Sequence, residues 1–335
     1  MSTSEQDRDK DLTTGVPARG EVATAELAEG NGQGMASQFD ELPDAPPRRR
    51  LRLSWTGRVA VGITLFWIVM AFAGPYIAPY DEAFFIEQDL KGQEILDPSF
   101  LPPSQLAYLG TDYLGRDVLS RVMWGARTTI GISFAATLLA YFVGITLGIA
   151  AAVAGGWTDS MLSRIDDAIL SFPNIMLGLI VIAAFNSSIP LLIGLAGLIY
   201  AASVFRIARA LGQDIMVQDF VEAARARGEG LWWIITREIL PNAAMPLATD
   251  FGLRFVFVIL FISSLSFLGL GVQPPTSDWG SMVRENLAGL GNGFWAGAIA
   301  SLAPAAAIAS LTIAINLIVD DISAHEGGSL AKKMV

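Results

Sequence analysis

The sequence predicts an all-α, polytopic membrane protein with six transmembrane helices. Of its 335 residues, 53% are hydrophobic and only 16% are charged, and the mean hydropathy is +0.49. Several apolar segments are long enough to cross a hydrocarbon core of about 30 Å at about 1.5 Å per helical residue. A soluble domain of this size would carry more charge on its surface. The bilayer is therefore expected to determine the architecture.

Residues 1–50 are predicted to form a disordered acidic tail on the cytoplasmic side. Residues 1–47 hold ten acidic and three basic residues and contain no apolar run that could offset the entropy lost on folding. The segment also lacks the continuous apolar stretch of a signal peptide. The net charge of −10 therefore says little about the transmembrane domain, predicted at residues 51–322.

Six segments of this domain are predicted to span the bilayer. The third and fourth are separated by "NSSIP", whose polar residues and proline suit a tight hairpin, and the fifth is long enough to tilt. Longer connections are expected at residues 80–128 and 208–243, with a C-terminal tail at 323–335. The predicted spans are residues 59–79, 129–153, 168–185, 190–207, 244–271 and 294–319.

Arginine and lysine predict the orientation, because positively charged segments stay in the cytoplasm. With the N-terminus inside, residues 80–128 face the periplasm and residues 208–243 face the cytoplasm. Thirteen basic residues then lie inside: Arg48, Arg49, Arg50, Arg52, Arg58, Arg164, Arg206, Arg209, Arg225, Arg227, Arg237, Lys332 and Lys333. Five lie outside: Lys91, Arg116, Arg121, Arg127 and Arg284. We therefore expect both termini to be cytoplasmic.

The connection at 208–243 is predicted to contain a short helix over residues 220–227, about 12 Å long and too short to span. Asp219 is expected to cap it, with Glu222 completing an acidic capping box. Gly228 and Gly230 can end the helix by adopting positive φ. From the residues alone, an amphipathic surface helix that only anchors the loop is as reasonable as a contact for another protein.

Several kinds of chemistry are not expected from this sequence. It has no cysteine and a single histidine, His325, and none of its four lysines lies in a phosphate-binding G-x-x-x-x-G-K-[ST] motif. We therefore predict no catalytic site, no metal site, no bound cofactor and no nucleic-acid partner. No convincing pair of matching halves is present, and the chain is short for a complete transporter of that kind, which suggests a half that pairs with another protein.

Asp250 and Arg254 are ionisable residues inside a predicted span, where an unpaired charge costs at least about 2.5 kcal/mol. Their spacing of four residues places them on one helix face. Two interpretations remain open. Either they line a substrate pathway, or they form a mutually satisfied pair near the cytoplasmic end of the span.

The connection at 208–243 also resembles a known family. It carries the E-A-A-x-x-x-G…I-x-L-P pattern of permease subunits of bacterial ATP-binding cassette (ABC) importers, here ending I-L-P. The resemblance implies a coupling helix that docks on an ATPase subunit. The small residues Ala223 and Ala224 would let that partner approach closely. The matching residues are Glu222, Ala223, Ala224, Gly228, Ile239, Leu240 and Pro241.

A longer motif narrows the family. "LGTDYLGRDVLSRVMWGART", residues 109–128, resembles the segment before the second span in dipeptide, oligopeptide and nickel permeases, and residues 264–283 are also similar. Its glycines permit turns, Asp117 can cap the next helix, and its arginines can pair with acids or with a partner permease. A well-capped helix without a transport role is the alternative. The candidate residues are Gly110, Asp112, Gly115, Arg116, Asp117 and Arg121.

The resemblance covers roughly residues 55–320 and implies the type I ABC importer permease fold in the bacterial inner membrane. Implied partners are a homologous second permease, two ABC ATPase subunits that use ATP and Mg²⁺, a periplasmic solute-binding protein and membrane lipid. The expected solutes are peptides or peptide-like compounds, with nickel complexes, opines or glutathione-like compounds as alternatives. An ion-coupled carrier or channel is the rival class. The long N-terminal tail and the unusual ending "DDISAHEGGSLAKKMV" depart from the family.

Overall fold

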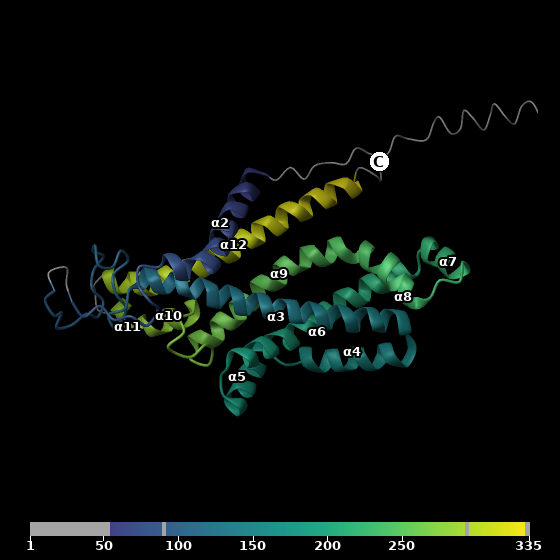
Figure 1. Cartoon of the computed structure of the whole chain (residues 1–335). Helices are drawn as coiled ribbons and strands as arrows, with labels where there is room; N and C mark the ends of the chain where they lie inside the picture. The colour runs from purple at the N-terminus through teal and green to yellow at the C-terminus, as the bar shows by residue number, and fades with distance from the viewer. Residues whose placement is uncertain (1–53, 89–91, 292–294, 332–335) are drawn as a thin grey trace, which may run out of the picture. The chain divides into compact units, whose positions relative to one another are not determined.

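A computed structural model describes residues 54–88, 92–291 and 295–331 (Figure 1). The predicted N-terminal tail, residues 1–50, lies outside the described residues. Within them, five helices are long and apolar enough to cross a membrane, or six if one sharply bent pair counts as a single span. The structure is therefore helical, and isolated β-bridges are confined to the connection before the second long helix.

The long helices match the predicted spans in order but are generally longer. α3 begins well inside the connection predicted at 80–128, and α12 continues to Ala331, so most of the tail predicted at 323–335 is helical. The long helices are α2 (Trp55–Ile77), α3 (Val118–Ala154), α6 (Ile189–Met216), a continuous helix over Leu231–Phe267, and α12 (Trp295–Ala331).

The span predicted at residues 168–185 is broken by a sharp bend. α4 (Gly156–Leu170) ends there, and α5 (Asn174–Phe185) starts after a bend of 84°. Pro173 explains the break, because proline cannot donate a backbone hydrogen bond and disfavours helical geometry in the residue before it. At twelve residues, α5 is about 18 Å long, too short to cross a bilayer alone.

The predicted connection at 208–243 is also shorter than expected. α6 runs to Met216, and a continuous helix starts at Leu231 as α8 (Leu231–Ile234), passes through a π-helical turn, η1 (Ile235–Ile239), and becomes α9 (Leu240–Phe267). Pro241 therefore does not begin a separate element. The π turn ends two residues before this proline, whose missing N–H cannot continue the α-helical hydrogen-bond pattern. Only residues 217–230 separate the two long helices.

α3 and α6 pack side by side and form the centre of the fold (Figure 1). Small residues allow the close approach: a Cβ on Gly144 would lie 2.6 Å from the Cβ of Val204, and one on Gly148 would lie 2.7 Å from the carbonyl oxygen of Phe205. Such contacts give membrane helices the van der Waals packing that holds them together. Bulkier residues at either glycine would push the helices apart.

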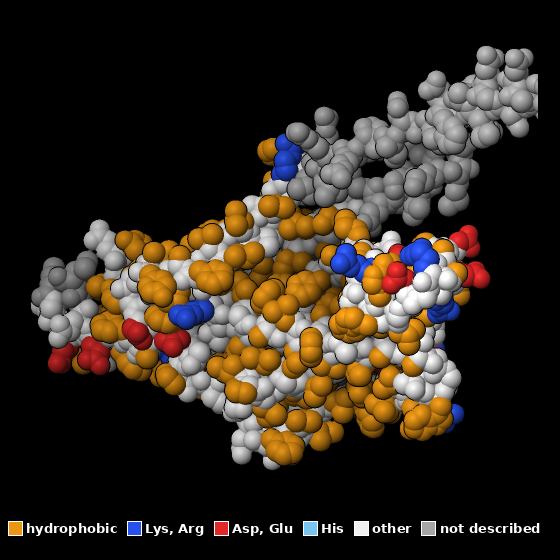
Figure 2. All heavy atoms as spheres, turned by 45° about the vertical axis from the view of Figure 1, so that its right-hand side comes forward, with side chains coloured by type: hydrophobic (Ala, Val, Ile, Leu, Met, Phe, Trp, Pro, Cys, Tyr) orange, Lys and Arg blue, Asp and Glu red, His pale blue; other side chains and the backbone are white. Residues whose placement is uncertain are grey.

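α2 and α12 also run side by side. The Trp67 indole donates a hydrogen bond to the Ser310 hydroxyl at 2.9 Å, and the backbone N–H of Ser54 donates to Asp321 at 2.9 Å. α12 reaches α9 where a Cβ on Gly252 would lie 2.5 Å from Val319. Hydrophobic side chains cover much of the middle of the face shown in Figure 2, and charged ones gather toward its ends. That pattern suits a protein surrounded by lipid.

Candidate functional site

The connection between α2 and α3 is built around the glycines of the 109–128 motif. Gly110 and Gly115 have φ of +79° and +81°, which confirms their predicted turn role. A Cβ on Gly110 would lie 2.4 Å from the carbonyl oxygen of Leu101, and one on Gly115 would lie 2.5 Å from Pro98. Both positions therefore require glycine for conformation and for space.

Asp117 is the N-cap of α3, as predicted. Its carboxylate accepts hydrogen bonds from the backbone N–H of Ser120 at 2.8 Å and from the Ser120 hydroxyl at 2.6 Å. A short antiparallel bridge joins Asp117 to Thr111. Burial raises the pKa of the Asp117 carboxyl, against the effect of these hydrogen bonds. The cap fixes where α3 begins and so where Arg121 lies.

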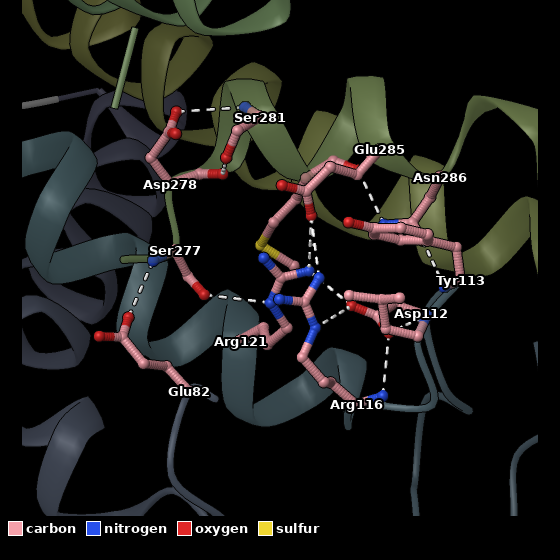
Figure 3. A network of polar contacts seen from close by, with 12 residues as sticks. Glu82, Asp112, Tyr113, Arg116, Arg121, Ser277, Asp278, Ser281, Glu285 and Asn286 are labelled. Atoms are coloured by element: carbon pink, nitrogen blue, oxygen red, sulfur yellow. Dashed lines mark hydrogen bonds and ion pairs between the residues drawn. The ribbon is translucent and has the colours of Figure 1, made fainter. Parts of the chain in front are cut away.

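Four charged side chains, three buried and one partly buried, meet next to this cap, and we call them the four-charge cluster: Asp112, Arg116, Arg121 and Glu285 (Figure 3). One Asp112 oxygen lies 2.7 Å from Arg116 Nε and 2.6 Å from Arg121 Nη1. Both arginines also reach one Glu285 oxygen at 3.0 Å. Exposed side-chain fractions are 0% for Asp112, 2% for Arg121, 6% for Arg116 and 11% for Glu285. The predicted pairing of the two arginines with acids is confirmed.

α10 (Trp279–Glu285) supplies the part of this site that the sequence did not predict. Its last residue, Glu285, closes the four-charge cluster. Ser277, two residues before the start of α10, accepts a hydrogen bond from Arg121 Nε at 3.0 Å. Asn286, just after it, accepts from the backbone N–H of Tyr113 at 3.1 Å. No local pattern marks Glu285 as a partner of Arg121, because 164 residues separate them.

Trp279 docks α10 on α3. It is fully buried, and its indole donates to the carbonyl oxygen of Val122 at 2.9 Å. A Cβ on Gly125 would lie 2.9 Å from the Trp279 ring, so that glycine makes room for it. Asp278 caps α10 by accepting from the backbone N–H groups of Gly280 and Ser281, and burial raises the pKa of its carboxyl. α10 is thus held by polar contacts and by an aromatic anchor.

At the other end of α3, residues 217–230 form the second candidate site. α7 (Asp219–Ala226) is followed by Gly228 with φ +83°, so the predicted helix and its glycine ending are confirmed. Two details are wrong. Asp219 does not cap α7 and forms no capping box with Glu222, because it is the first residue of the helix and the N-cap position is Gln218, which makes no side-chain cap bond. Gly230 does not adopt positive φ: its φ is −75°, and it precedes α8. The Glu222 side chain is exposed and has no hydrogen-bond or ionic partner among the residues that the structure describes.

The small residues of α7 do not both face outward as predicted. Ala223 is exposed, but Ala224 is fully buried against this chain. Ala224 and Val221 pack with Ile149 near the end of α3 and with Ile234 and Ile239. Of the remaining motif residues, Leu240 is half-buried and Pro241 is exposed. The motif therefore divides into two groups. Some of its residues hold α7 against the long helices, whereas others lie at the surface, namely Glu222, Ala223 and Gly228.

The two candidate sites share one helix. Arg121 and Ile149 are 28 residues apart on α3, or about 42 Å along the helix axis, and Figure 1 shows α7 and α10 toward opposite ends of it. The structure thus does not bring the two predicted motifs together. It links them by a single continuous helix.

The third predicted site is the pair Asp250 and Arg254, which lies near the middle of the Leu231–Phe267 helix. Arg254 Nε is 3.2 Å from the first Asp250 carboxylate oxygen, which confirms that the two residues pair. The second oxygen accepts a 2.6 Å hydrogen bond from the hydroxyl of Tyr141 on α3. Tyr141 was not predicted, because nothing in the sequence distinguishes it from other aromatic residues of an apolar span.

The fold holds two further arginine pairs. Arg206 on α6 contacts Asp166 at 2.8 Å and Asp167 at 2.6 Å, and Arg209 pairs with Asp159, all three acids lying on α4. Both arginines thus use their terminal nitrogens on this chain's own carboxylates. Among the described residues, no group of three or more His, Cys, Asp or Glu side chains is placed to hold a metal ion.

Comparison with known proteins gives a consistent result. The family model described as "Binding-protein-dependent transport system inner membrane component" matches residues 144–325. A protein named glutathione transport system permease protein GsiD from Pectobacterium atrosepticum is 32% identical over 234 residues, 68% of this chain and 73% of that protein. Its namesake from Escherichia coli is 33% identical over 247 residues, 71% of this chain and 76% of that protein.

Among solved structures, one described as inward-facing conformations of the MetNI methionine ABC transporter is similar to this chain. It covers 61% of this chain and 96% of its own, with 16% sequence identity and a TM-score of 0.43. That score is too low to establish a common fold by itself. The sequence matches identify the family.

Proposed function

Because this chain belongs to the family of binding-protein-dependent transport system inner membrane components, we propose that it takes peptides or peptide-like solutes across the membrane by alternating access. The chain is a multi-pass permease subunit of an ABC importer. The observation that carries the solute class is the similarity over 71% of the chain to permeases named for glutathione transport. Glutathione is itself a small peptide-like compound with free carboxylates.

Three kinds of partner complete the proposed importer: a homologous second permease, two ATPase subunits that use ATP and Mg²⁺, and a solute-binding protein. The need for a second membrane subunit is supported by the large apolar side chains that this chain leaves exposed. Phe142 on α3 and Leu198 on α6 are 73% and 57% exposed, although these two helices form the centre of the fold. ATP hydrolysis belongs to the ATPase subunits.

The ATPase contact is proposed at α7 and its turn. Glu222 and Ala223 are exposed, whereas Val221 and Ala224 fix α7 on Ile149 of α3. A partner that pushes on this short helix would therefore move the end of α3 and the start of the Leu231–Phe267 helix together. This arrangement suits transmission of ATPase motion into the membrane helices.

The proposed orientation follows from the same surface. α7 and α8 face the cytoplasm, where the ATPase subunits would bind, and the four-charge cluster faces the periplasm. The exposed arginines of the α7 region support this assignment, because basic residues collect on the cytoplasmic side. Arg225 and Arg237 are two of them.

Reconstituted uptake tests the proposal. Proteoliposomes would contain this chain with the second permease and both ATPase subunits, and would receive binding protein loaded with glutathione, with tripeptides or with nickel complexes. We expect uptake of a peptide or of glutathione that stops when ATP is omitted. Uptake by this chain alone, driven by an ion gradient, would contradict the proposal. Uptake of nickel complexes only would agree with an ABC importer but would reject peptides as its solute class.

A further inference from the structure

We infer that the terminal guanidinium nitrogens of Arg254 bind a carboxylate of the solute while it crosses the membrane. This inference rests on the proposed function and assigns one contact within it. It concerns the paired residues in the middle of the Leu231–Phe267 helix, away from both α7 and the four-charge cluster.

Arg254 uses only part of its hydrogen-bonding capacity within the chain. Its Nε contacts Asp250, and neither terminal nitrogen donates a hydrogen bond to any of residues 54–88, 92–291 and 295–331. The side chain is 21% exposed. By contrast, Arg121 in the four-charge cluster is 2% exposed and reaches two carboxylates with one terminal nitrogen. Arg254 therefore retains donors that can reach a ligand.

The neighbouring surface of the helix is open. Residues spaced by three and four along it form one face, which starts at Asp250 and continues through Leu253, Phe257 and Leu260; these three are 36%, 47% and 42% exposed. Past Leu260, the face borders a groove of about 550 Å³ between α9, α10 and α12, which Ser263 and Thr312 help to line. The pair therefore sits at the start of an apolar track that leads toward the α10 end.

The chemistry of this pair favours an anion. A guanidinium stays protonated, and its two terminal nitrogens form a planar fork that matches a carboxylate. Asp250 is already engaged by Arg254 and by the Tyr141 hydroxyl, so its charge is partly compensated. In surroundings of low polarity, a charge-assisted hydrogen bond is stronger than it would be in water. Every unmodified peptide carries at least one carboxylate, which makes a peptide a fitting solute.

Asp250 and Tyr141 act as positioning residues in this assignment. Asp250 holds the Nε edge of the guanidinium, which directs the terminal nitrogens away from the pair. Tyr141 is 8% exposed and packs edge-on against Phe251 with ring centroids 5.0 Å apart, so its hydroxyl is fixed relative to Asp250. α3 thereby sets the side-chain orientation of a residue on the neighbouring helix.

The test compares two forms of one solute in the complete importer. Triglycine, which has a single carboxylate, would be supplied as the free acid and with its C-terminus amidated, on binding protein at saturating concentration. Glutathione would be supplied as the free acid only, because its glutamyl carboxylate would remain after amidation of its glycine. The affinity of the binding protein for each form is measured separately, so that capture and translocation are distinguished. Uptake would be recorded for wild type, Arg254→Gln, Arg254→Lys and the control Arg164→Gln, which replaces an exposed arginine of α4.

We expect Arg254→Gln to lower the ratio of acid to amide uptake by roughly tenfold or more, the value of a hydrogen bond to a charged group. Lysine keeps the charge but loses the fork, so its ratio should be intermediate. Arg164→Gln should keep the wild-type ratio. Equal losses for acid and amide would overturn the inference, as would a wild-type ratio in a well-assembled Arg254→Lys complex. If the wild-type importer takes up neither solute in any form, the proposed function fails and the inference falls with it.

Discussion

The four-charge cluster and the α7 turn use the same residue types in opposite environments. In the cluster, two acids and two arginines are buried or partly buried and every charge has a partner at 3.0 Å or less. At α7, the Glu222 side chain is exposed and has no partner among the described residues. Both regions carry sequence motifs of the same family, and α3 connects them. Buried and paired charges fix a structure, whereas exposed and unpaired charges remain available to another subunit.

This difference shows that a sequence motif can be explained either by contacts within the chain or by contacts with another subunit. The residues at 109–128 are explained by contacts within the chain: glycines where no Cβ fits, a cap at Asp117, and arginines that join α10 to α3. The residues at 222–241 are explained only in part by such contacts. Gly228 ends α7 with positive φ, but the exposed side chains of Glu222 and Ala223 have no evident role inside the chain, which supports a role between chains.

Arg121→Ala should have the largest effect. It would leave Asp112 and Glu285 with one arginine between them in a buried site, and breaking a buried ion pair costs about 3–5 kcal/mol. We expect a large fall in the thermal unfolding temperature of the purified subunit or complex. Arg164→Ala, at an exposed site, is the matched control. An unfolding temperature equal to that of the control would show that the cluster does not stabilise the fold.

Gly115→Ala is expected to have a medium effect. Gly115 and Gly228 have nearly the same φ, +81° and +83°, but a Cβ at 115 would lie 2.5 Å from Pro98, whereas nothing lies within 4 Å of one at 228. Both alanines pay roughly 1 kcal/mol for the backbone conformation, and only Gly115→Ala adds the cost of overpacking, about 1–3 kcal/mol. Thermal unfolding of both variants measures the difference. Equal shifts would mean that the surroundings of Gly115 give way freely.

Asp278→Asn should change the pH dependence of stability. Burial raises the pKa of the Asp278 carboxyl in the folded protein, so this group contributes most stability below its ordinary pKa and loses that contribution as the pH rises through the raised value. Asparagine can cap α10 without a charge. We therefore expect the variant to match or exceed wild type in unfolding temperature at neutral pH, with the advantage shrinking as the pH is lowered. A variant that is less stable than wild type at neutral pH and equally stable in acid would contradict the predicted direction of the pH dependence.

Glu222→Gln should have the smallest effect on stability. The side chain is exposed, and substitutions at such positions usually change the free energy of unfolding by less than about 0.5 kcal/mol. The unfolding temperature of the isolated subunit should therefore equal that of wild type within error. A clear loss would show that Glu222 has an internal role and would weaken the contrast with the four-charge cluster.

Local patterns predicted local features well. The positive φ of Gly110, Gly115 and Gly228 and the cap at Asp117 followed from residue type and position. The Asp250–Arg254 pair followed from helical spacing. Each of these depends on a few neighbouring residues.

Features that depend on distant contacts were missed. Glu285 and Tyr141 are identified as partners only when α10 and α3 are placed beside Arg121 and Asp250. The inward orientation of Ala224 depends on Ile149 and Ile239, which packing alone brings together. The break at Pro173 and the continuity through Pro241 show that one residue type can end a helix or be absorbed by a π turn, according to its surroundings.

The most direct test of the central claim, that α7 transmits ATPase motion, is charge reversal at Glu222 in the complete importer. ATPase retention, hydrolysis stimulated by loaded binding protein, and uptake would be measured for Glu222→Lys and for Glu94→Lys, an exposed acid in the connection between α2 and α3. A lysine in the first turn of α7 opposes the helix dipole and reverses an exposed charge. We predict normal membrane insertion and solute capture with weaker ATPase retention or less uptake per ATP hydrolysed, and wild-type behaviour for Glu94→Lys. Wild-type values of all three measurements for Glu222→Lys would contradict the claim.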